Sequence, residues 1–315
     1  MTSKLVTRDG IRPSVRRGRA AWRQGLLTAV AATFMVTGSA AAQARPEEIA
    51  RGKYVFGATG GCGCHSEKDR PLHSGGRRYD GPFGTVYSTN ITPDRDTGIG
   101  TWTDEQIITA IRLGRRPNGE RLLPVHPFTV FNGMAEGDLK ALVAYLRTLP
   151  PVSRKNQAKK ISVPLFESVF LPAWLAAFAP RETPPPQAPT SGLPLGEYLV
   201  RAVGHCGECH TPRTATMATD NSRFLSGTAK GPENSSVPNI TPDPETGIGK
   251  WSVDQIAEYL ATGNRPDGDV AGGLMGEVIQ GTSAGYKDMT RADLTAVAQF
   301  LKSIPAIKNR VESKP

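Results

Sequence analysis

Residues 206–210 read Cys-Gly-Glu-Cys-His, and this stretch decides how the rest of the chain is interpreted. Cysteines at positions i and i+3 lie on the same side of a helical turn, so both thiols can reach the two vinyl groups of one haem. The histidine that follows offers its imidazole to the iron. The motif therefore predicts a c-type haem attached through Cys206 and Cys209, with His210 as one axial ligand. A zinc site would need two more ligands, and only His205 is nearby.

The opposite face of that iron needs a second ligand. Met275 lies 65 residues after His210, in the Gly-rich stretch 272–276 that precedes the last expected helix. Methionine opposite histidine raises the reduction potential of a haem. We therefore expect Met275 to bind the iron, whereas Met289 is closer to the last helix and fits a packing role. Met217 follows His210 too closely to cross a haem.

An internal repeat organises the chain. Asn-Ile-Thr-Pro-Asp-Arg-Asp-Thr-Gly-Ile-Gly-Thr-Trp at 90–102 recurs, with few changes, at 239–251. Each copy predicts the same order of elements. An opening helix (47–55 and 195–203) leads into a Cys/His segment and a loop rich in Gly and Pro. A helix begun by a capping box (103–106 and 252–255) follows, and then a final helix (136–149 and 291–304).

The expected elements define the fold class. No convincing alternating strand pattern is present, so we predict an all-α, loop-rich fold of two tandem domains, each built around a covalently bound haem. Domains this small bury too little apolar surface to be stable without help, and a covalently held haem supplies a large apolar plate for short helices to pack against. The predicted boundaries are 45–152 and 191–315. The apolar, Pro-rich segment 153–190 between them fits either a strap packed across both domains or a docking surface for a partner subunit or the membrane interface.

The formal net charge of +9 is concentrated at the amino terminus. Residues 1–44 hold seven basic residues and one acidic residue, which leaves +3 for the rest of the chain. Haem propionates would remove that excess, so nucleic-acid binding is not expected. The basic stretch, a short apolar run and small residues ending at Ala44 have the order of a secretory signal. We expect residues 1–44 to be removed on export to the periplasm; an uncleaved anchor is the alternative.

The first copy of the haem motif departs from the pattern. It reads Cys62-Gly-Cys64-His65, one residue short. On a helix, Cys62 and Cys64 would point about 200° apart. Three interpretations fit: one thioether through Cys64 with His65 on the iron, two thioethers with a locally distorted backbone, or no covalent haem. The duplicated surroundings argue against the last.

The far side of the first site offers two main candidates. His126 stands between prolines in a loop, 61 residues after His65, and Met134 lies four residues before Asp138. Met289 lies four residues before Asp293 in the second copy, so Met134 matches a residue with an expected packing role. We therefore favour His126 as the ligand. His73 is too close to His65 to be a strong candidate.

These residues resemble one family. The stretch 204–213, both copies of the repeated loop, and the ending 141–151 are similar to periplasmic multihaem cytochrome c subunits of membrane-bound alcohol, aldehyde and gluconate dehydrogenases. The resemblance covers nearly the whole mature chain. It implies class I cytochrome c folds and electron transfer from a dehydrogenase toward quinone, a terminal oxidase or another cytochrome, with peripheral membrane association left open.

Two departures from the family pattern matter. Those subunits usually carry three haem sites, and this chain has two. Their first domain usually has a methionine in a Pro-x-Met-Pro setting, where this chain has His126-Pro127. Two nitrogen ligands give a lower potential than histidine with methionine, so we expect electrons to pass from the first haem to the second.

Two other classes of function were weighed against electron transfer. Dihaem peroxidases and thiosulfate-oxidising cytochromes also combine unlike haems, but an iron with both faces occupied has no open position for a substrate. No paired acid and base residues point to catalysis. A haem-based sensor would need a signalling domain, which the sequence lacks. The repeated Asn90, Asn239, Trp102 and Trp251 fit either contacts with haem or, as we favour, packing of the loops.

Overall fold

The computed structural model describes residues 44–179 and 183–312. Nearly all of the expected signal sequence therefore lies outside the described residues. No helix in the described ranges is both long and apolar enough to cross a bilayer.

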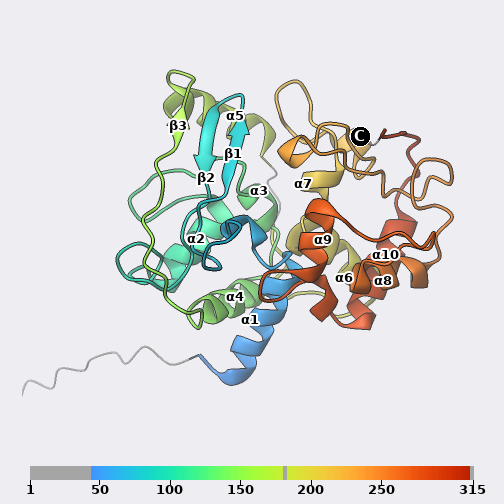
Figure 1. The fold of residues 1–315 in the computed structure, drawn as a ribbon, viewed down its shortest axis with the longest axis horizontal. Coiled ribbons are helices and arrows are strands. Elements are labelled where there is room, and N and C mark those ends of the chain that lie inside the picture. Colours follow the sequence, from blue (N-terminus) through green and yellow to red (C-terminus); the bar gives the residue numbers. More distant parts are fainter. Residues whose placement is uncertain (1–43, 180–182, 313–315) are drawn as a thin grey trace, which may run out of the picture. The chain divides into compact units, whose positions relative to one another are not determined.

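The elements follow the order expected from the repeat (Figure 1). The first copy contains α1 (Pro46–Ala58), a 3₁₀ turn (Gly63–His65), β1 (Arg78–Gly81), β2 (Gly84–Tyr87), α2 (Asp104–Leu113), α3 (Phe128–Phe131) and α4 (Glu136–Leu146). The intervening segment contains β3 (Lys160–Ile161), a π-helical turn (Phe166–Phe170) and α5 (Leu171–Phe178). The second copy contains α6 (Gly192–Tyr198), a π-helical turn (Leu199–Val203), α7 (Cys206–His210), α8 (Val253–Thr262), α9 (Gly273–Gln280) and α10 (Arg291–Ser303).

Both predicted capping boxes are present. The hydroxyl of Thr103 accepts a hydrogen bond from the backbone of Gln106, whose side chain returns one to the Thr103 N–H. Ser252 and Gln255 repeat this arrangement at the start of α8. These bonds satisfy backbone donors that a helix leaves unpaired at its amino end.

In each copy the opening helix crosses the final helix at a glycine. A Cβ on Gly52 of α1 would lie 1.9 Å from the carbonyl oxygen of Ala141 in α4. A Cβ on Gly196 of α6 would lie 2.1 Å from that of Ala296 in α10. Only glycine allows the two backbones to approach so closely, and the helix pairs bring Val55, Leu142, Leu199 and other side chains into one continuous buried cluster.

The prediction of an all-α fold was wrong in one respect. The chain is rich in helix, but β1, β2 and β3 form a small antiparallel sheet in that order. Strands of four and two residues are too short to show an alternating pattern in the sequence. The third strand also comes from the segment that follows the first copy, with Ile161 paired to Gly84, so no local signal announces it.

The two copies hold each other through equivalent tyrosines. Tyr198 of α6 donates to the carboxylate of Asp138 (2.8 Å), and its hydroxyl oxygen accepts from the Ala135 N–H (3.1 Å) at the start of α4. In the reciprocal contact, Tyr54 of α1 donates to Asp293 and accepts from the Thr290 N–H (3.3 Å) at the start of α10. Each opening helix thus caps the final helix of the other copy.

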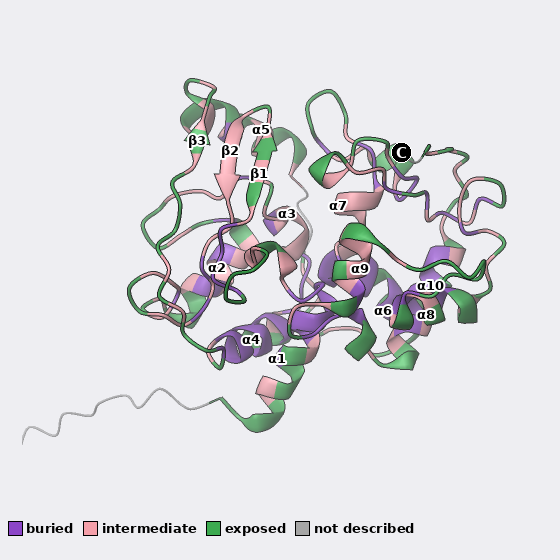
Figure 2. Ribbon diagram, in the orientation of Figure 1, coloured by how far each residue is buried: buried purple, intermediate pink, exposed green. Residues whose placement is uncertain are grey.

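The segment between the copies is both packed and exposed. Phe166 packs against Phe83 at the tip of the β1–β2 hairpin, and the indole N–H of Trp174 donates to the carbonyl of Thr216 in the second copy. Leu165 is nevertheless 67% exposed and Phe170 55%, and much of α5 is exposed (Figure 2). The segment therefore contacts both copies, as a strap would, and keeps an apolar surface. The boundaries at 152 and 191 stay predictions.

Replacing Tyr198 with phenylalanine tests the cross-copy contact. The change removes the donor to Asp138 and leaves the buried Ala135 N–H without its acceptor, which costs about 1–3 kcal/mol. We expect the free energy of unfolding in denaturant titrations to fall by this amount. The control is Tyr259→Phe, because the Tyr259 hydroxyl makes no hydrogen bond within the described residues. Equal stability of both variants would contradict the role given to Tyr198.

Candidate haem sites

The histidine of the second motif is held in one tautomer. Nδ1 of His210 lies 2.8 Å from the carbonyl oxygen of Pro238. A carbonyl can only accept, so Nδ1 carries the proton and Nε2 keeps its lone pair. Burial lowers the pKa of His210, which also favours the neutral ring. A neutral imidazole with Nδ1 bound to a carbonyl is the usual state of a histidine that coordinates a metal through Nε2.

The first motif has the same arrangement despite its shorter cysteine spacing. Nδ1 of His65 lies 2.7 Å from the carbonyl oxygen of Thr89, so its Nε2 is also free to act as a ligand. Burial lowers the pKa of His65, and the nearby guanidinium of Arg116 lowers it further. The two carbonyls belong to equivalent residues, each directly before the asparagine of the repeated loop.

Those asparagines fix the position of the carbonyls. Asn239 is 3% exposed; its amide donates to the carbonyl of Ile307 (2.7 Å), and its oxygen accepts from the backbone (2.9 Å) and hydroxyl (2.8 Å) of Thr241. Asn90 makes the matching bonds to Val152 and Thr92. The residues following each final helix are thereby tied to the loop that orients the histidine.

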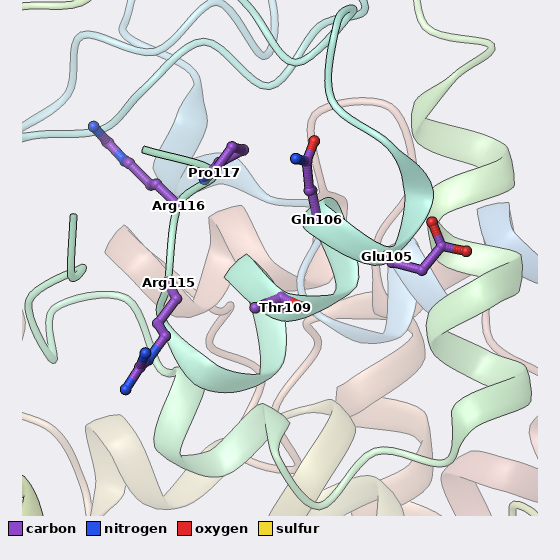
Figure 3. Close-up of a pocket in the computed structure, with 6 residues that line it drawn as sticks. All are labelled: Glu105, Gln106, Thr109, Arg115, Arg116 and Pro117. Carbon is purple, nitrogen blue, oxygen red and sulfur yellow. The ribbon is translucent and has the colours of Figure 1, made fainter. Parts of the chain in front are cut away.

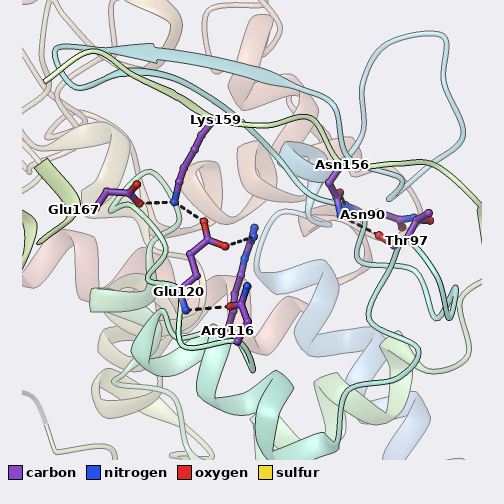
Figure 4. Close-up of polar contacts among 8 residues, drawn as sticks. Asn90, Thr97, Arg116, Glu120, Asn156, Lys159 and Glu167 are labelled. Carbon is purple, nitrogen blue, oxygen red and sulfur yellow. Dashed lines mark hydrogen bonds and ion pairs between the residues drawn. The ribbon is translucent and has the colours of Figure 1, made fainter. Parts of the chain in front are cut away.

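The segment 153–190 between the copies, called the strap below, adds a further hydrogen bond to the first copy of the repeated loop. The backbone N–H of Asn90 donates to the side chain of Asn156 (2.7 Å), which in turn donates to the carbonyl of Thr97 (2.9 Å) (Figure 4). The contacts of Asn90 and Asn239 confirm that these residues pack the loops. The sequence did not reveal their link to the histidines, and the only available signal was the repetition itself.

The cysteines of the second site have the geometry that the motif predicts. Cys206 and Cys209 stand one turn apart in α7 and carry free thiols. Burial raises the pKa of Cys206 to about 11 and is the main cause that raises the pKa of Cys209 to about 12. Both thiols therefore stay protonated at neutral pH. In the described ranges, no group of three or more His, Cys, Asp or Glu residues could hold a bare metal ion.

The first site differs at Cys62. The backbone N–H of Gly61 donates to the carbonyl of Phe56 and that of Gly204 to the carbonyl of Leu199, in each case across five residues, although Gly61 has a left-handed backbone (φ 67°) and Gly204 does not (φ −78°). The next residue has a left-handed backbone in both copies, Cys62 with φ 50° and His205 with φ 40°. Cys62 thus occupies the place of His205, not that of the first attaching cysteine.

The thiol of Cys62 contacts a residue that precedes the motif. Its Sγ lies 3.8 Å from the hydroxyl of Thr59, and burial raises its pKa to about 12. Cys64 is exposed and directly precedes His65, as Cys209 precedes His210. Counted back from the histidine, Cys64 is the residue equivalent to Cys209. The left-handed residue therefore stands two positions closer to the histidine in the first copy, at Cys62, than in the second, at His205.

His126 is the candidate ligand with an unsatisfied atom. Its Nδ1 is buried and has no hydrogen-bond partner in the described residues. Burial, together with the neighbouring His65 and His205, lowers the pKa of His126 to about 3, so the ring is neutral. Met134 is fully buried in the hydrophobic cluster. His73 packs edge-on against Phe56 and places Nε2 3.2 Å from the hydroxyl of Ser283.

Met275 lies in a different kind of element from the one expected. The sequence suggested a Gly-rich loop, but residues Gly273–Gln280 form α9. The two glycines before Met275 obscured the helical pattern in the sequence. The apolar residues of this helix include Leu274, Val278 and Ile279. Met275 is half-buried and packs against the hydrophobic cluster. Met289 also packs against this cluster, as the sequence predicted.

A chain of charges lies beside the first site and was not predicted. Arg116 pairs with Glu120 (2.9 Å), Glu120 with Lys159, and Lys159 with Glu167 of the strap (Figure 4). Arg116 also lines a hollow of about 130 Å³ along α2, together with Arg115 and Pro117 (Figure 3). No cysteine or histidine lines this hollow, so it is separate from the candidate haem ligands.

The donor set at both sites fits haem c. Each site presents a neutral imidazole with a free Nε2 directly after a cysteine, which is the arrangement that a covalently attached haem requires. The unsatisfied Nδ1 of His126 adds a buried nitrogen near the first site.

The chain is similar to several cytochromes. It is 36% identical over 277 residues to a diheme cytochrome c-type protein of Cereibacter sphaeroides, covering 83% of this chain and 87% of that protein. It is 35% identical over 312 residues to the cytochrome c subunit of an alcohol dehydrogenase (quinone) of Gluconobacter oxydans, and 35% identical over 292 residues to that of a gluconate 2-dehydrogenase of Pantoea cypripedii. These two alignments cover 96% and 90% of this chain but only 63% and 65% of the subunits. No protein-family model matches the chain.

Acid should destabilise the protein partly through His73. Burial lowers the pKa of His73 to about 4, below the value near 6.5 of an unfolded histidine. The unfolded state therefore takes up a proton first, and stability present above pH 6.5 is lost as the pH falls toward 4, by on the order of 2–3 kcal/mol. Asparagine tolerates the left-handed backbone of residue 73, so His73→Asn should make the fall in unfolding free energy shallower. Denaturant titrations between pH 7.5 and 4 measure it; parallel curves would contradict the assignment.

Proposed function

The chain belongs to the family of dihaem c-type cytochromes and dehydrogenase cytochrome c subunits, and from this premise we propose that it relays electrons through two covalently bound haems. Members of this family are electron-transfer proteins or subunits and not the catalytic subunits of their complexes. When bound, each haem supplies an iron that alternates between the ferric and ferrous states. The observation that carries the proposal is the equivalent orientation of His65 and His210, both fixed for coordination through Nε2.

The second site takes the simpler ligand set. Cys206 and Cys209 would hold the haem, with His210 and Met275 on the two faces of its iron. The assignment of Met275 rests on its place in α9, 65 residues after His210, because packing against the hydrophobic cluster is common to Met275 and Met289. Histidine with methionine gives the higher potential of the two sites.

The first site would hold its haem through Cys64 alone. The left-handed backbone at Cys62 and the contact of its thiol with Thr59 support a single thioether. A second thioether through Cys62 would require the backbone to change before the thiol could reach a vinyl group. His65 and His126 would be the axial ligands, since Met134 is fully buried in the hydrophobic cluster.

Because the two irons would have different axial ligands, electrons would pass preferentially in one direction between the haems. Two histidines lower the potential of the first haem relative to the second, so electrons from a dehydrogenase would enter at the first and leave from the second. The final acceptor would be quinone, an oxidase or another cytochrome. The expected export signal would place this exchange in the periplasm. The substrates named for the relatives, an alcohol and gluconate, suggest where to look for the donor.

Mass spectrometry of cysteine variants tests the attachment. We expect the mature protein to carry two haem masses, Cys62→Ala to keep both, and Cys64→Ala to lose one, because only Cys64 has the position of an attaching cysteine. Cys209→Ala serves as the comparison for the second site, where Cys206 remains as a tether. Peptide mapping locates each haem. Loss of a haem in Cys62→Ala would show that Cys62 is also a tether.

Redox titration with spectra tests the axial ligands. Met275→His should lower one midpoint potential toward the other and remove the methionine–iron band of the ferric spectrum, because a nitrogen replaces the sulfur. His126→Ala should open the first iron to added imidazole or carbon monoxide. Met289→Leu and Met134→Leu are matched controls and should change neither the band nor ligand binding. A spectrum unchanged by Met275→His would exclude Met275.

A further inference from the structure

Three aromatic rings connect the two sites. The ring of His126 meets that of Phe131 edge to face, with centroids 5.7 Å apart and planes at 71°. Phe131 meets His205 in the same way, at 5.4 Å and 68°. His205 directly precedes Cys206 in the sequence. A continuous series of ring contacts therefore leads from the candidate ligand of the first site to the residue beside the first attaching cysteine of the second.

The three rings are held in place by their surroundings. Phe131 ends α3, and α3 lies against the π-helical turn Leu199–Val203 that leads to His205. The left-handed backbone of His205 sets the direction of its side chain at the start of α7. On the other side, the ring of Phe128 lies nearly parallel to that of His126, with centroids 6.5 Å apart. Phe131 is thus the ring that contacts both histidines.

Other contacts bring the two haem segments together independently. The hydroxyl of Thr282, which follows α9 in the second copy, donates to the carbonyl of Gly61 beside the first motif (2.7 Å). Arg77 of the first copy pairs with Glu277 of α9 (2.7 Å). The α9 region, which holds Met275, is therefore in contact with residues on both sides of the first motif.

We propose that Phe131 and His205 form the bridge through which an electron passes between the two haems, an inference that rests on the proposed function. With both haems bound, one electron would leave the ferrous iron that His65 and His126 would hold, and that iron would become ferric. The electron would reduce to the ferrous state the ferric iron that His210 and Met275 would hold. No bond is made or broken and no proton is transferred. Phe131 and His205 are positioning residues that stay unchanged.

The physical basis is the distance dependence of electron tunnelling. Electronic coupling decays exponentially across gaps between atoms and decays less along bonded atoms and rings in contact. His126 would be bonded to the first iron, and His205 is joined through the backbone to Cys206, which would be bonded to the second haem. Only the two ring contacts of Phe131 separate these bonded segments. Removing its ring opens a gap at the centre of the route.

The decisive experiment measures electron exchange between the haems in the holoprotein. A photogenerated flavin radical delivers one electron per molecule, and absorbance follows its redistribution between the two haems. We expect Phe131→Leu, which keeps an apolar side chain but removes the ring, to slow the redistribution several-fold. Phe131→Tyr keeps the ring and should restore the rate. Midpoint potentials and ligand-sensitive spectra should match those of the wild type. If Phe131 had only a structural role, a slower rate would be accompanied by changes in the potentials or the spectra.

Two further variants complete the test. Phe128→Leu removes a ring that packs on His126 without contacting His205, so it should leave the rate unchanged. His205→Asn removes the ring at the other end of the bridge, tolerates the left-handed backbone, and should slow the exchange as Phe131→Leu does. If His205→Asn and Phe131→Leu both exchange electrons at the wild-type rate, the bridge is excluded. A wild-type protein with only one haem by mass would instead overturn the proposed function.

Discussion

The hydrogen bond between each motif histidine and a backbone carbonyl is the constraint on which the rest of the structure depends. His65 and His210 are separated from their acceptors by loops with few regular elements, so neither bond arises from local geometry. Asn90 and Asn239 make the bonds possible, because each ties its loop to the residues that follow a final helix. The segment that follows each final helix therefore helps to hold the carbonyl that orients the imidazole.

Reciprocal contacts also join the two copies. Tyr54 and Tyr198 occupy equivalent positions and cap the final helices of opposite copies, which gives the pair an approximate two-fold relation. Contacts of this kind are expected where two related surfaces meet, since each surface offers what the other requires.

The two candidate sites differ in the residues beside the motif histidine and on the far side of the iron. Cys62 has the left-handed backbone of His205, and the first copy offers His126, whose buried Nδ1 has no hydrogen-bond partner in the described residues. Arg116 places a positive charge beside the first site, and its pairs with Glu120 and onward to Lys159 link it to the strap. The second motif keeps a regular helical turn, α7. A duplicated scaffold thus gives the two candidate sites different residues and different surroundings.

The repeat, both capped helices and the motif at Cys206, Cys209 and His210 could be predicted from the sequence, because these signals depend on residues close together in the chain. It also pointed to His126 through its proline neighbours. The fold of the complete chain was needed to identify the carbonyl partners of the histidines, the third strand of the small sheet and the contact between Phe131 and His205. Each of these joins residues tens of positions apart, and such a pairing leaves no periodic trace in the sequence. The helix that holds Met275 is local, and the glycines at its start concealed it.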